Sequence, residues 1–213
     1  YKANDHLEAS SCLSNLVIND IDNSKKESYS IGLSGGNTPK IAYSMLGSDI
    51  KDLSKITFWT VDDRWLPKED DNSNQKLINS FFSNSSAKVL EFEYSSSTSS
   101  KDANDYSNKL QENIKEFDTV ILGIGEDGHI ASLFPGKYKS NNEQVIAVVN
   151  APKIPPNRVS LTIPALTNCN NLVVMAIGKE KRMALKDLLS GAELPVKALN
   201  PACGIDLYTD QIY

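Results

Sequence analysis

Cysteine, histidine and long apolar runs are all scarce in this sequence of 213 residues. The three cysteines, Cys12, Cys169 and Cys203, form no C-x-x-C pair, so the chain lacks the spacing of a zinc site or a disulfide framework. Scattered cysteines of this kind are typical of reduced thiols, and we expect a cytoplasmic protein. The longest apolar stretches, such as LVVMAI, are far shorter than the roughly 20 residues of a membrane helix, so no membrane association is expected.

Positive charge is also in the minority, because 22 basic residues stand against 27 acidic ones and the net charge is −5. A negative surface argues against nucleic acid as the main partner. It does not exclude a small anionic substrate, because a local pocket can be positive on a negative protein. The chain length and the hydrophobic content of 40% suit one compact domain, residues 1–213. We expect this domain to be a monomer or a weak homo-oligomer.

The sequence is rich in apolar strand patterns that alternate with amphipathic helix patterns. Strands are predicted for YSIGL, KITFWTV, KVLEFEY, TVILGI, QVIAVVN, RVSLTI and NLVVMAIG. Helices are predicted for residues 4–23, 39–46 and 75–82, for a segment capped by Asp102, and for KEKRMALKDLLSG. This alternation predicts an α/β fold with a mostly parallel sheet and helices on both faces. The polar segment DDRWLPKEDDNSN is predicted to be a long, functional loop.

Residues 118–136 (DTVILGIGEDGHIASLFPG) combine a buried strand with glycines in the spacing G-x-G-x-x-G. This spacing is the dinucleotide-binding fingerprint, which requires a long helix after the third glycine. Pro135 would end such a helix within about two turns, and no acidic residue lies about 20 positions onward to bind a ribose, so the match is weak. The turn instead presents Glu126, Asp127 and His129 at the carboxyl end of a strand, where ligands bind in open α/β sheets. A structural role for His129, such as helix capping, stays open.

Two further junctions between a strand and a helix have features of an anion site. The segment SGGNT comprises Ser34, Gly35, Gly36, Asn37 and Thr38. It offers backbone N–H groups before a helix start, although an ordinary turn with Thr38 as N-cap is the alternative. Lys181, in the segment IGKEKR, lies at the start of another helix, where a cation is unfavourable unless an anion binds there. Solvated lysines are the alternative for this segment.

The segment DDRW carries two carboxylates and a guanidinium away from the end of a predicted strand. Asp62 and Arg64 are candidates to face a substrate, and a plain surface loop is the alternative. No further residues with metal-ligand spacing accompany Asp62 and Asp63, so no metal site is predicted. Arg158 begins another predicted strand. Because these features all lie at strand ends, together they predict a phosphate pocket in an enzyme that acts on a small phosphorylated metabolite.

Five motifs in this order resemble the glucosamine-6-phosphate isomerase/6-phosphogluconolactonase family: SGGNTP, DDRWLPKEDDNSN, GIGEDGHIASLFPG, NRVSLTIPAL and GKEKR. The resemblance runs from about Ser30 to Arg182, and SLFPG after DGH is its most diagnostic part. It implies a Rossmann-like fold and hydrolysis of 6-phospho-D-glucono-1,5-lactone to 6-phospho-D-gluconate in the pentose phosphate pathway, without a cofactor. The family often has Glu at the position of Asp63 and Thr at the position of Ile130.

With this resemblance, the expected mechanism is attack by an activated water. Neutral His129 would accept a proton from the water, and Asp127 would orient the imidazole ring. The SGGNT segment and Lys181 would bind the phosphate, with Arg158 as a second clamp, and either Arg64 or Arg158 would stabilise the oxyanion. The alternative activity is a sugar-phosphate deaminase or isomerase in which Asp62 moves a proton on carbon. A non-catalytic sugar-phosphate sensor would not need His129.

Overall fold

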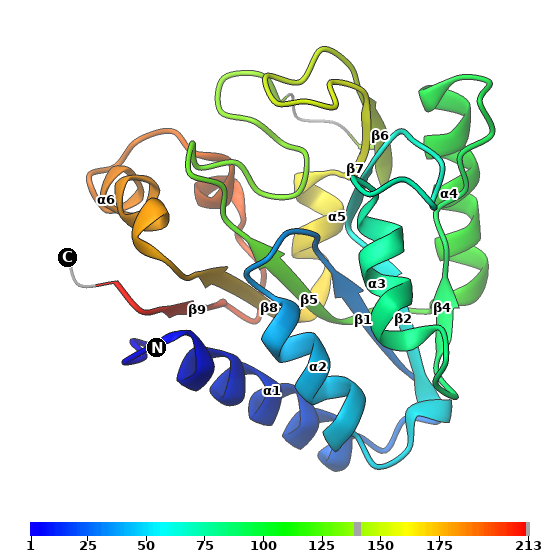
Figure 1. Ribbon diagram of the computed structural model, residues 1–213, viewed down its shortest axis with the longest axis vertical. Helices are drawn as coiled ribbons and strands as arrows, with labels where there is room; N and C mark the ends of the chain where they lie inside the picture. Colours follow the sequence, from blue (N-terminus) through cyan, green and yellow to red (C-terminus); the bar gives the residue numbers. More distant parts are fainter. Residues whose placement is uncertain (139–141, 212–213) are drawn as a thin grey trace.

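A parallel sheet forms the centre of the molecule (Figure 1). The structure is a computed structural model that describes residues 1–138 and 142–211. The main sheet has six strands in the order β4-β2-β1-β5-β8-β9, and each neighbouring pair is parallel. Its strands are β1 (Tyr29–Leu33), β2 (Ile56–Thr60), β4 (Lys88–Leu90), β5 (Phe117–Gly123), β8 (Cys169–Ala176) and β9 (Ile205–Thr209).

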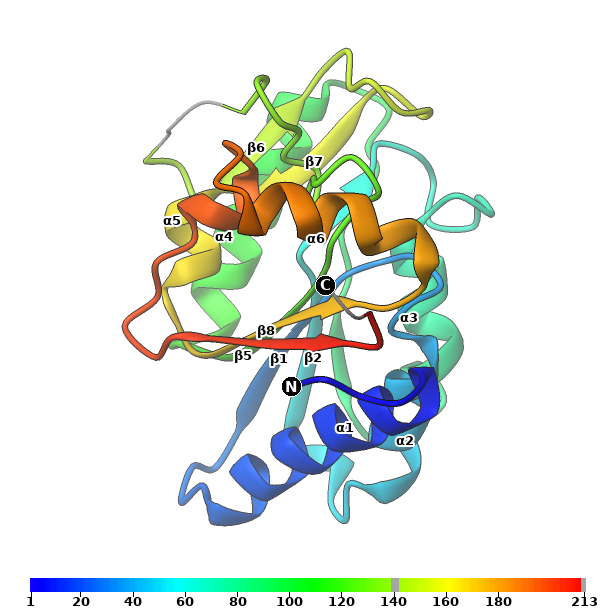
Figure 2. The same ribbon diagram turned by 90° about the vertical axis from the view of Figure 1, so that its left-hand side faces the viewer.

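Helices cover both faces of this sheet (Figure 2). One face carries α1 (His6–Asn23), α2 (Lys40–Asp49), the short 3₁₀ helix η1 (Leu53–Lys55) and α3 (Asn74–Phe82). The other face carries α4 (Ser99–Asn113), α5 (Ile163–Thr167), α6 (Arg182–Leu189) and η3 (Pro195–Ala198), while η2 (Lys179–Lys181) leads into α6. The predicted α/β fold with a mostly parallel sheet is confirmed. Within the described residues, no helix is long and apolar enough to cross a membrane.

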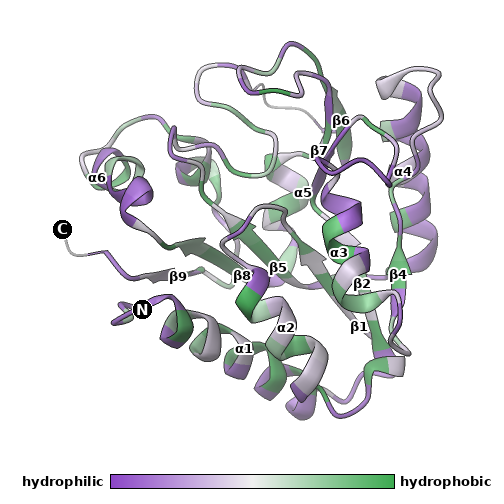
Figure 3. Cartoon of the chain, viewed as in Figure 1, coloured by the Kyte–Doolittle hydropathy of each residue, from purple (hydrophilic) through white to green (hydrophobic). Residues whose placement is uncertain are grey.

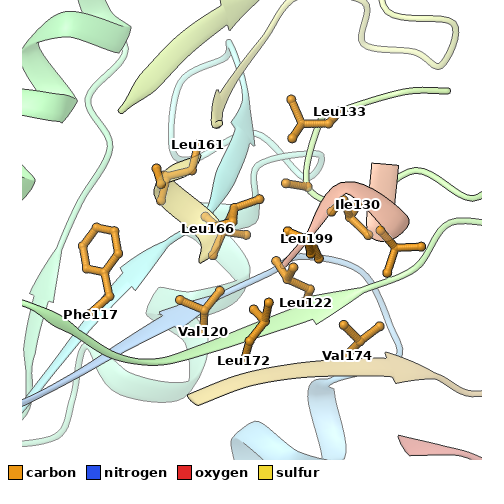
Figure 4. Close-up of a cluster of buried hydrophobic side chains, with 14 of the residues drawn as sticks. Phe117, Val120, Leu122, Ile130, Leu133, Leu161, Leu166, Leu172, Val174 and Leu199 are labelled. Carbon is orange, nitrogen blue, oxygen red and sulfur yellow. The ribbon is translucent and has the colours of Figure 1, made fainter. Parts of the chain in front are cut away.

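The position of β5 in the middle of the sheet explains its unbroken apolar sequence. Alternate side chains of a strand point to opposite faces, and both faces of β5 are covered. Val120 and Leu122 lie in one hydrophobic cluster, whereas Ile121 lies in the other. Figure 4 shows the first cluster, in which Leu166 of α5 and Leu199 after η3 face the sheet. Figure 3 shows the corresponding concentration of hydrophobic residues along β5 and β8.

A second, smaller sheet is antiparallel and has the strand order β3-β7-β6. Its strands are β3 (Asp62–Arg64), β7 (Arg158–Leu161) and β6 (Val145–Val148). Only Val61 separates β3 from β2, so this sheet begins at the carboxyl end of the main sheet. The prediction of DDRW as a loop is therefore wrong for its first three residues, because they pair with β7, which lies far away in the sequence.

The prediction of Asp102 as a helix cap is also wrong, and the alternative in which Thr38 is an N-cap does not hold. Pro39, not Thr38, occupies the N-cap position of α2, and the Thr38 carbonyl accepts a hydrogen bond from His6 Nε2 at 2.7 Å. Asp102 lies inside the first turn of α4, whose N-cap is Thr98. Its carboxylate instead accepts hydrogen bonds from the chain before the helix and from the Trp65 indole at 2.8 Å. Strand β9 was not predicted, and it closes one edge of the main sheet.

Candidate active site

The centre of the main sheet is a topological switch point. β1 and β5 are neighbours, and the chain proceeds from β1 toward one edge of the sheet and from β5 toward the other. Ligands of open α/β sheets bind in the crevice outside the carboxyl ends of such strands. A pocket lies here, and the sequence-predicted residues that line it are Ser34, Gly35, Gly36, Asn37, Thr38, Asp62, Arg64, His129, Arg158 and Lys181. The predicted residues are thus gathered in one pocket, with Asp127 in contact behind His129.

The SGGNT segment after β1 presents backbone donors to the pocket. The N–H groups of residues 35–38 make no hydrogen bond to any described residue. Gly36 has φ +90°, a conformation that favours glycine. A Cβ at Gly35 would lie 1.8 Å from Asn74 Oδ1, so only glycine fits there. Ser34 Oγ accepts a hydrogen bond from Gly123 N at 3.2 Å, which ties this segment to the end of β5. Free N–H groups at a strand–helix junction form an anion site.

The glycines that resemble a dinucleotide fingerprint build a tight turn under the histidine. Gly125 N donates to the His129 carbonyl at 2.7 Å, and Gly128 N donates to the Gly125 carbonyl at 3.0 Å. A Cβ at Gly125 would lie 2.0 Å from His129 Nδ1, so the imidazole packs directly over this backbone. Residues 129–138 form turns and isolated bridges, without the long helix that a dinucleotide site needs.

His129 and Asp127 form a hydrogen-bonded pair. The distance from His129 Nδ1 to Asp127 Oδ1 is 2.5 Å. Burial lowers the pKa of His129 below its ordinary value, and the Asp127 charge opposes this shift without cancelling it. Burial raises the pKa of Asp127, but the hydrogen bond and charge of His129 and the charge of Lys153 outweigh that effect and leave it below its usual value. At neutral pH the pair is therefore a carboxylate and a neutral imidazole whose Nδ1–H donates to Asp127, which leaves Nε2 as a free base.

The two neighbouring carboxylates of β3 have different roles. Asp62 lines the pocket and accepts a hydrogen bond from Ser132 Oγ at 2.6 Å. Asp63 points away and accepts hydrogen bonds from the N–H groups of Asn74 at 2.6 Å and Gln75 at 2.8 Å. Burial raises the pKa of Asp63 to about 6, so it is still ionised at neutral pH. Asp63 therefore anchors the start of α3 to β3, a structural role that the sequence left open.

Arg64 and Arg158 lie opposite each other on β3 and β7. Arg158 is 4% exposed and packs over the Phe134 ring, 5.5 Å from its centroid. Arg64 Nη1 donates to Asn74 Oδ1 at 3.0 Å, while its buried Nε has no partner among the described residues. Like charges placed opposite each other in an antiparallel pair are destabilising, and an anion bound between them would reverse that effect.

Lys181 is the third predicted cation of the pocket. It ends η2, directly before α6, and its side chain is half-buried. No hydrogen bond or ion pair joins its ammonium group to another described residue. The ammonium group is therefore available to a ligand.

Glu126, which was predicted at this strand end, also lines the pocket, whereas two further polar lining residues, Asn74 and Lys153, were not predicted from the sequence. Asn74 Nδ2 donates to the Asp62 carbonyl at 2.9 Å, so its amide connects Asp62 with Arg64. The motif DDRWLPKEDDNSN includes this asparagine, but only the fold of the loop brings it back to β3. Lys153 lies just before Arg158, in a segment without strand or helix pattern. No group of three or more His, Cys, Asp or Glu side chains within the described residues could hold a metal ion.

The fold and the pocket together define a class of protein. It is a Rossmann-like α/β protein whose switch-point pocket combines free N–H donors, four cationic side chains and a neutral histidine, and such a pocket suits a small phosphorylated molecule. The family model described as "Glucosamine-6-phosphate isomerases/6-phosphogluconolactonase" matches residues 5–208, and the chain belongs to this family.

Relatives of this chain include 6-phosphogluconolactonases from two bacteria. The protein from Borreliella burgdorferi is 34% identical over 179 residues, which cover 79% of this chain and 76% of that protein. The protein from Thermotoga maritima is 30% identical over 178 residues, which cover 80% of this chain and 79% of that protein. The crystal structure of a Thermotoga maritima 6-phosphogluconolactonase superposes with a TM-score of 0.89 at 25% identity, covering 98% of this chain and 97% of that one.

Proposed function

We propose that this protein hydrolyses 6-phospho-D-glucono-1,5-lactone to 6-phospho-D-gluconate, the lactonase step of the pentose phosphate pathway. The observation that carries the proposal is the His129–Asp127 pair beside the free N–H groups of residues 35–38, in one pocket. This arrangement offers a base for a water molecule and an anion site for the phosphate. Membership of the family and relatives of that activity support the same substrate.

The chemistry needs one base and one oxyanion donor. His129 Nε2 accepts a proton from a water molecule, and the oxygen of that water bonds to the lactone carbonyl carbon. The tetrahedral oxyanion then collapses, and the bond between the carbonyl carbon and the ring oxygen breaks. Protonated His129 returns the proton to that ring oxygen, which becomes a hydroxyl group. Asp127 holds the ring through Nδ1 and stabilises its positive charge in between.

The contacts of Arg158 and Arg64 indicate that the two arginines have different roles. Arg158 packs over Phe134, whose ring lies 4.7 Å from the His129 ring. We therefore assign the oxyanion to Arg158. Arg64 contacts Asn74, whose side chain packs against Gly35 of the SGGNT segment. We assign Arg64 to the phosphate, together with the N–H groups of residues 35–38 and Lys181.

The remaining expectations about this protein are also proposals. We infer that it acts in the cytoplasm, because all three cysteines are free thiols. We infer that its partner is the small sugar phosphate and not nucleic acid, in keeping with the net charge of −5. We expect residues 1–213 to act as a single domain, as a monomer or a weak homo-oligomer.

The decisive experiment compares two substrates. Freshly generated lactone is assayed by acid release above its spontaneous opening, beside ammonia release from glucosamine 6-phosphate, each with and without EDTA. We expect lactone hydrolysis that persists in EDTA and no ammonia release. Ammonia release without faster lactone opening would instead support the deaminase alternative, with Asp62 as the base on carbon. Loss of lactonase activity in EDTA would leave the assignment of the substrate intact but contradict the metal-free mechanism.

A further inference from the structure

A lysine outside all of the sequence motifs touches the acid–base pair. Lys153 Nζ lies 3.4 Å from Asp127 Oδ1, the same oxygen that His129 Nδ1 contacts at 2.5 Å. The lysine side chain is 42% exposed and the aspartate side chain 37% exposed, so the two charges are only partly solvated. One carboxylate oxygen therefore has two cationic or proton-donating neighbours.

The backbone that carries Lys153 is held in place by Arg158. The Arg158 guanidinium donates to the Pro155 carbonyl at 2.9 Å and to the Lys153 carbonyl at 3.3 Å. Ala151 N closes the same segment by donating to the Pro156 carbonyl at 2.9 Å. A lysine whose main chain is fixed in this way reaches Asp127 at a smaller loss of conformational entropy than one on a free loop.

These contacts form a closed ring around the site. Lys153 contacts Asp127, Asp127 contacts His129, and the His129 ring packs on Phe134. Arg158 also packs over the Phe134 ring and donates to the Lys153 carbonyl. The ring joins the turn after β5 to the segment before β7.

We propose that Lys153 is a positioning residue for the general base: by sharing the Asp127 carboxylate with His129, it keeps the imidazole uncharged and its proton on Nδ1. This inference rests on the proposed function, in which His129 Nε2 accepts the proton from water. An ammonium group beside Asp127 keeps the carboxylate ionised, and an ionised carboxylate retains the Nδ1 proton. The same positive charge disfavours a second proton on the ring.

Lys153 shifts the pKa of His129 in the direction that its proposed positioning role requires. The charged groups around His129 come from four parts of the chain. They are Glu126 and Asp127 in the turn after β5, Asp62 and Arg64 on β3, Lys153 in the segment before β7 with Arg158 on β7 itself, and Lys181 in η2. Lys153 lowers the pKa of His129, whereas Asp127 and Asp62 raise it. Removal of Lys153 therefore raises the pKa of His129, both by losing its repulsion and by leaving the Asp127 charge unshared.

The chain offers a direct measurement, because its only histidines are His6 and His129. The pKa of both rings is followed by NMR in the wild type and in Lys153→Met, Lys153→Arg and Lys137→Met. Lys137 is an exposed lysine whose Nζ, among the described residues, contacts only the Asn150 carbonyl, at 3.5 Å. The Lys137→Met variant therefore removes one positive charge, as Lys153→Met does. His6, bound to the Thr38 carbonyl, is the internal reference.

We expect the pKa of His129 to rise by about 0.5 unit in Lys153→Met and to stay within about 0.2 unit in Lys153→Arg and Lys137→Met. The apparent pKa of the acid limb in the pH profile of kcat/KM should rise by the same amount. At pH values below this pKa, kcat/KM should therefore be about threefold lower in Lys153→Met than in the wild type, with KM unchanged. An unchanged His129 pKa in Lys153→Met would overturn the proposal, as would an equal shift in Lys137→Met. A large rise in KM with an unchanged pKa would overturn it too and make Lys153 a phosphate ligand.

Failure of the proposed function would be recognised separately. The NMR titration needs no substrate, so it decides the action of Lys153 on His129 even if the lactone is not hydrolysed. An active enzyme with no change in the pKa of His129 refutes the role of Lys153 alone.

Discussion

A single histidine carries the proposed chemistry at the scale of residues. His129→Asn keeps a polar side chain of similar size but removes the free Nε2 base. We expect kcat to fall at least about 100-fold, because general-base catalysis is typically worth 10²–10⁴, while KM changes little. The assay is lactone hydrolysis corrected for spontaneous opening, with circular dichroism as the control for folding. A variant within a few-fold of the wild type would move the base role to Asp62 or Asp127.

The two arginines should separate in their kinetics. Arg64→Ala is expected to raise KM at least tenfold with a small change in kcat, because the phosphate is held alike in the ground and transition states. Arg158→Ala is expected to lower kcat by about 10²–10³, the usual cost of one oxyanion donor. Steady-state kinetics on the lactone measure both effects. The reverse pattern would exchange the two assignments. Because Arg158 also donates to the Pro155 carbonyl, the thermal stability of the Arg158→Ala variant is measured as a control.

At the scale of secondary-structure elements, the buried Asp63 carboxylate holds the start of α3 in place. Asp63→Asn preserves shape but turns one acceptor oxygen into an NH₂ group, which then faces the N–H group of either Asn74 or Gln75. We expect a loss of about 1–3 kcal/mol in the free energy of unfolding, or roughly 2–12 °C in Tm. Asp71→Asn, at a side chain that is 95% exposed in the same loop, is the matched control. Equal Tm values for both variants would show that Asp63 does not anchor the helix.

The pairing of β3 with β7 also explains why sequence reasoning misjudged DDRW. Its polar composition is typical of a loop, and a three-residue strand is too short to show alternation. β3 exists because Asp62, Asp63 and Arg64 find partners on β7, far away in the sequence. The prediction of Asp102 as a helix cap failed for a related reason, since Asp102 has a good capping side chain but its carboxylate accepts hydrogen bonds from Trp65 and Ser95.

At the scale of the whole molecule, a bound ligand should contact residues from both sheets at once. The pocket takes residues 35–38 and His129 from loops of the main sheet, and Arg64 and Arg158 from the small sheet. 6-Phosphogluconate at about 100 times its Kd should therefore stabilise the fold by about 2.7 kcal/mol, or roughly 5–11 °C in Tm. Differential scanning fluorimetry measures this shift. Gluconate, which lacks the phosphate, is the control, and an equal shift with it would contradict a phosphate site.

The sequence by itself determined the local parts of this protein. The apolar runs defined the central strands, and the polar residues that follow these runs placed His129, Asp62 and the SGGNT segment at strand ends, where the structure gathers them in one pocket. These features depend on neighbours in the chain: side-chain alternation in a strand, and the freedom of Gly36 to adopt positive φ.

Only the tertiary structure decided which distant groups meet. Lys153 reaches Asp127, Asn74 bridges Asp62 and Arg64, and the two arginines face each other, because long-range strand pairing and a folded loop bring these segments together. No short stretch of sequence encodes such contacts, since a polar residue in a loop has the same local pattern whether it faces solvent or a pocket. The backbone positions that the whole core imposes determine that difference.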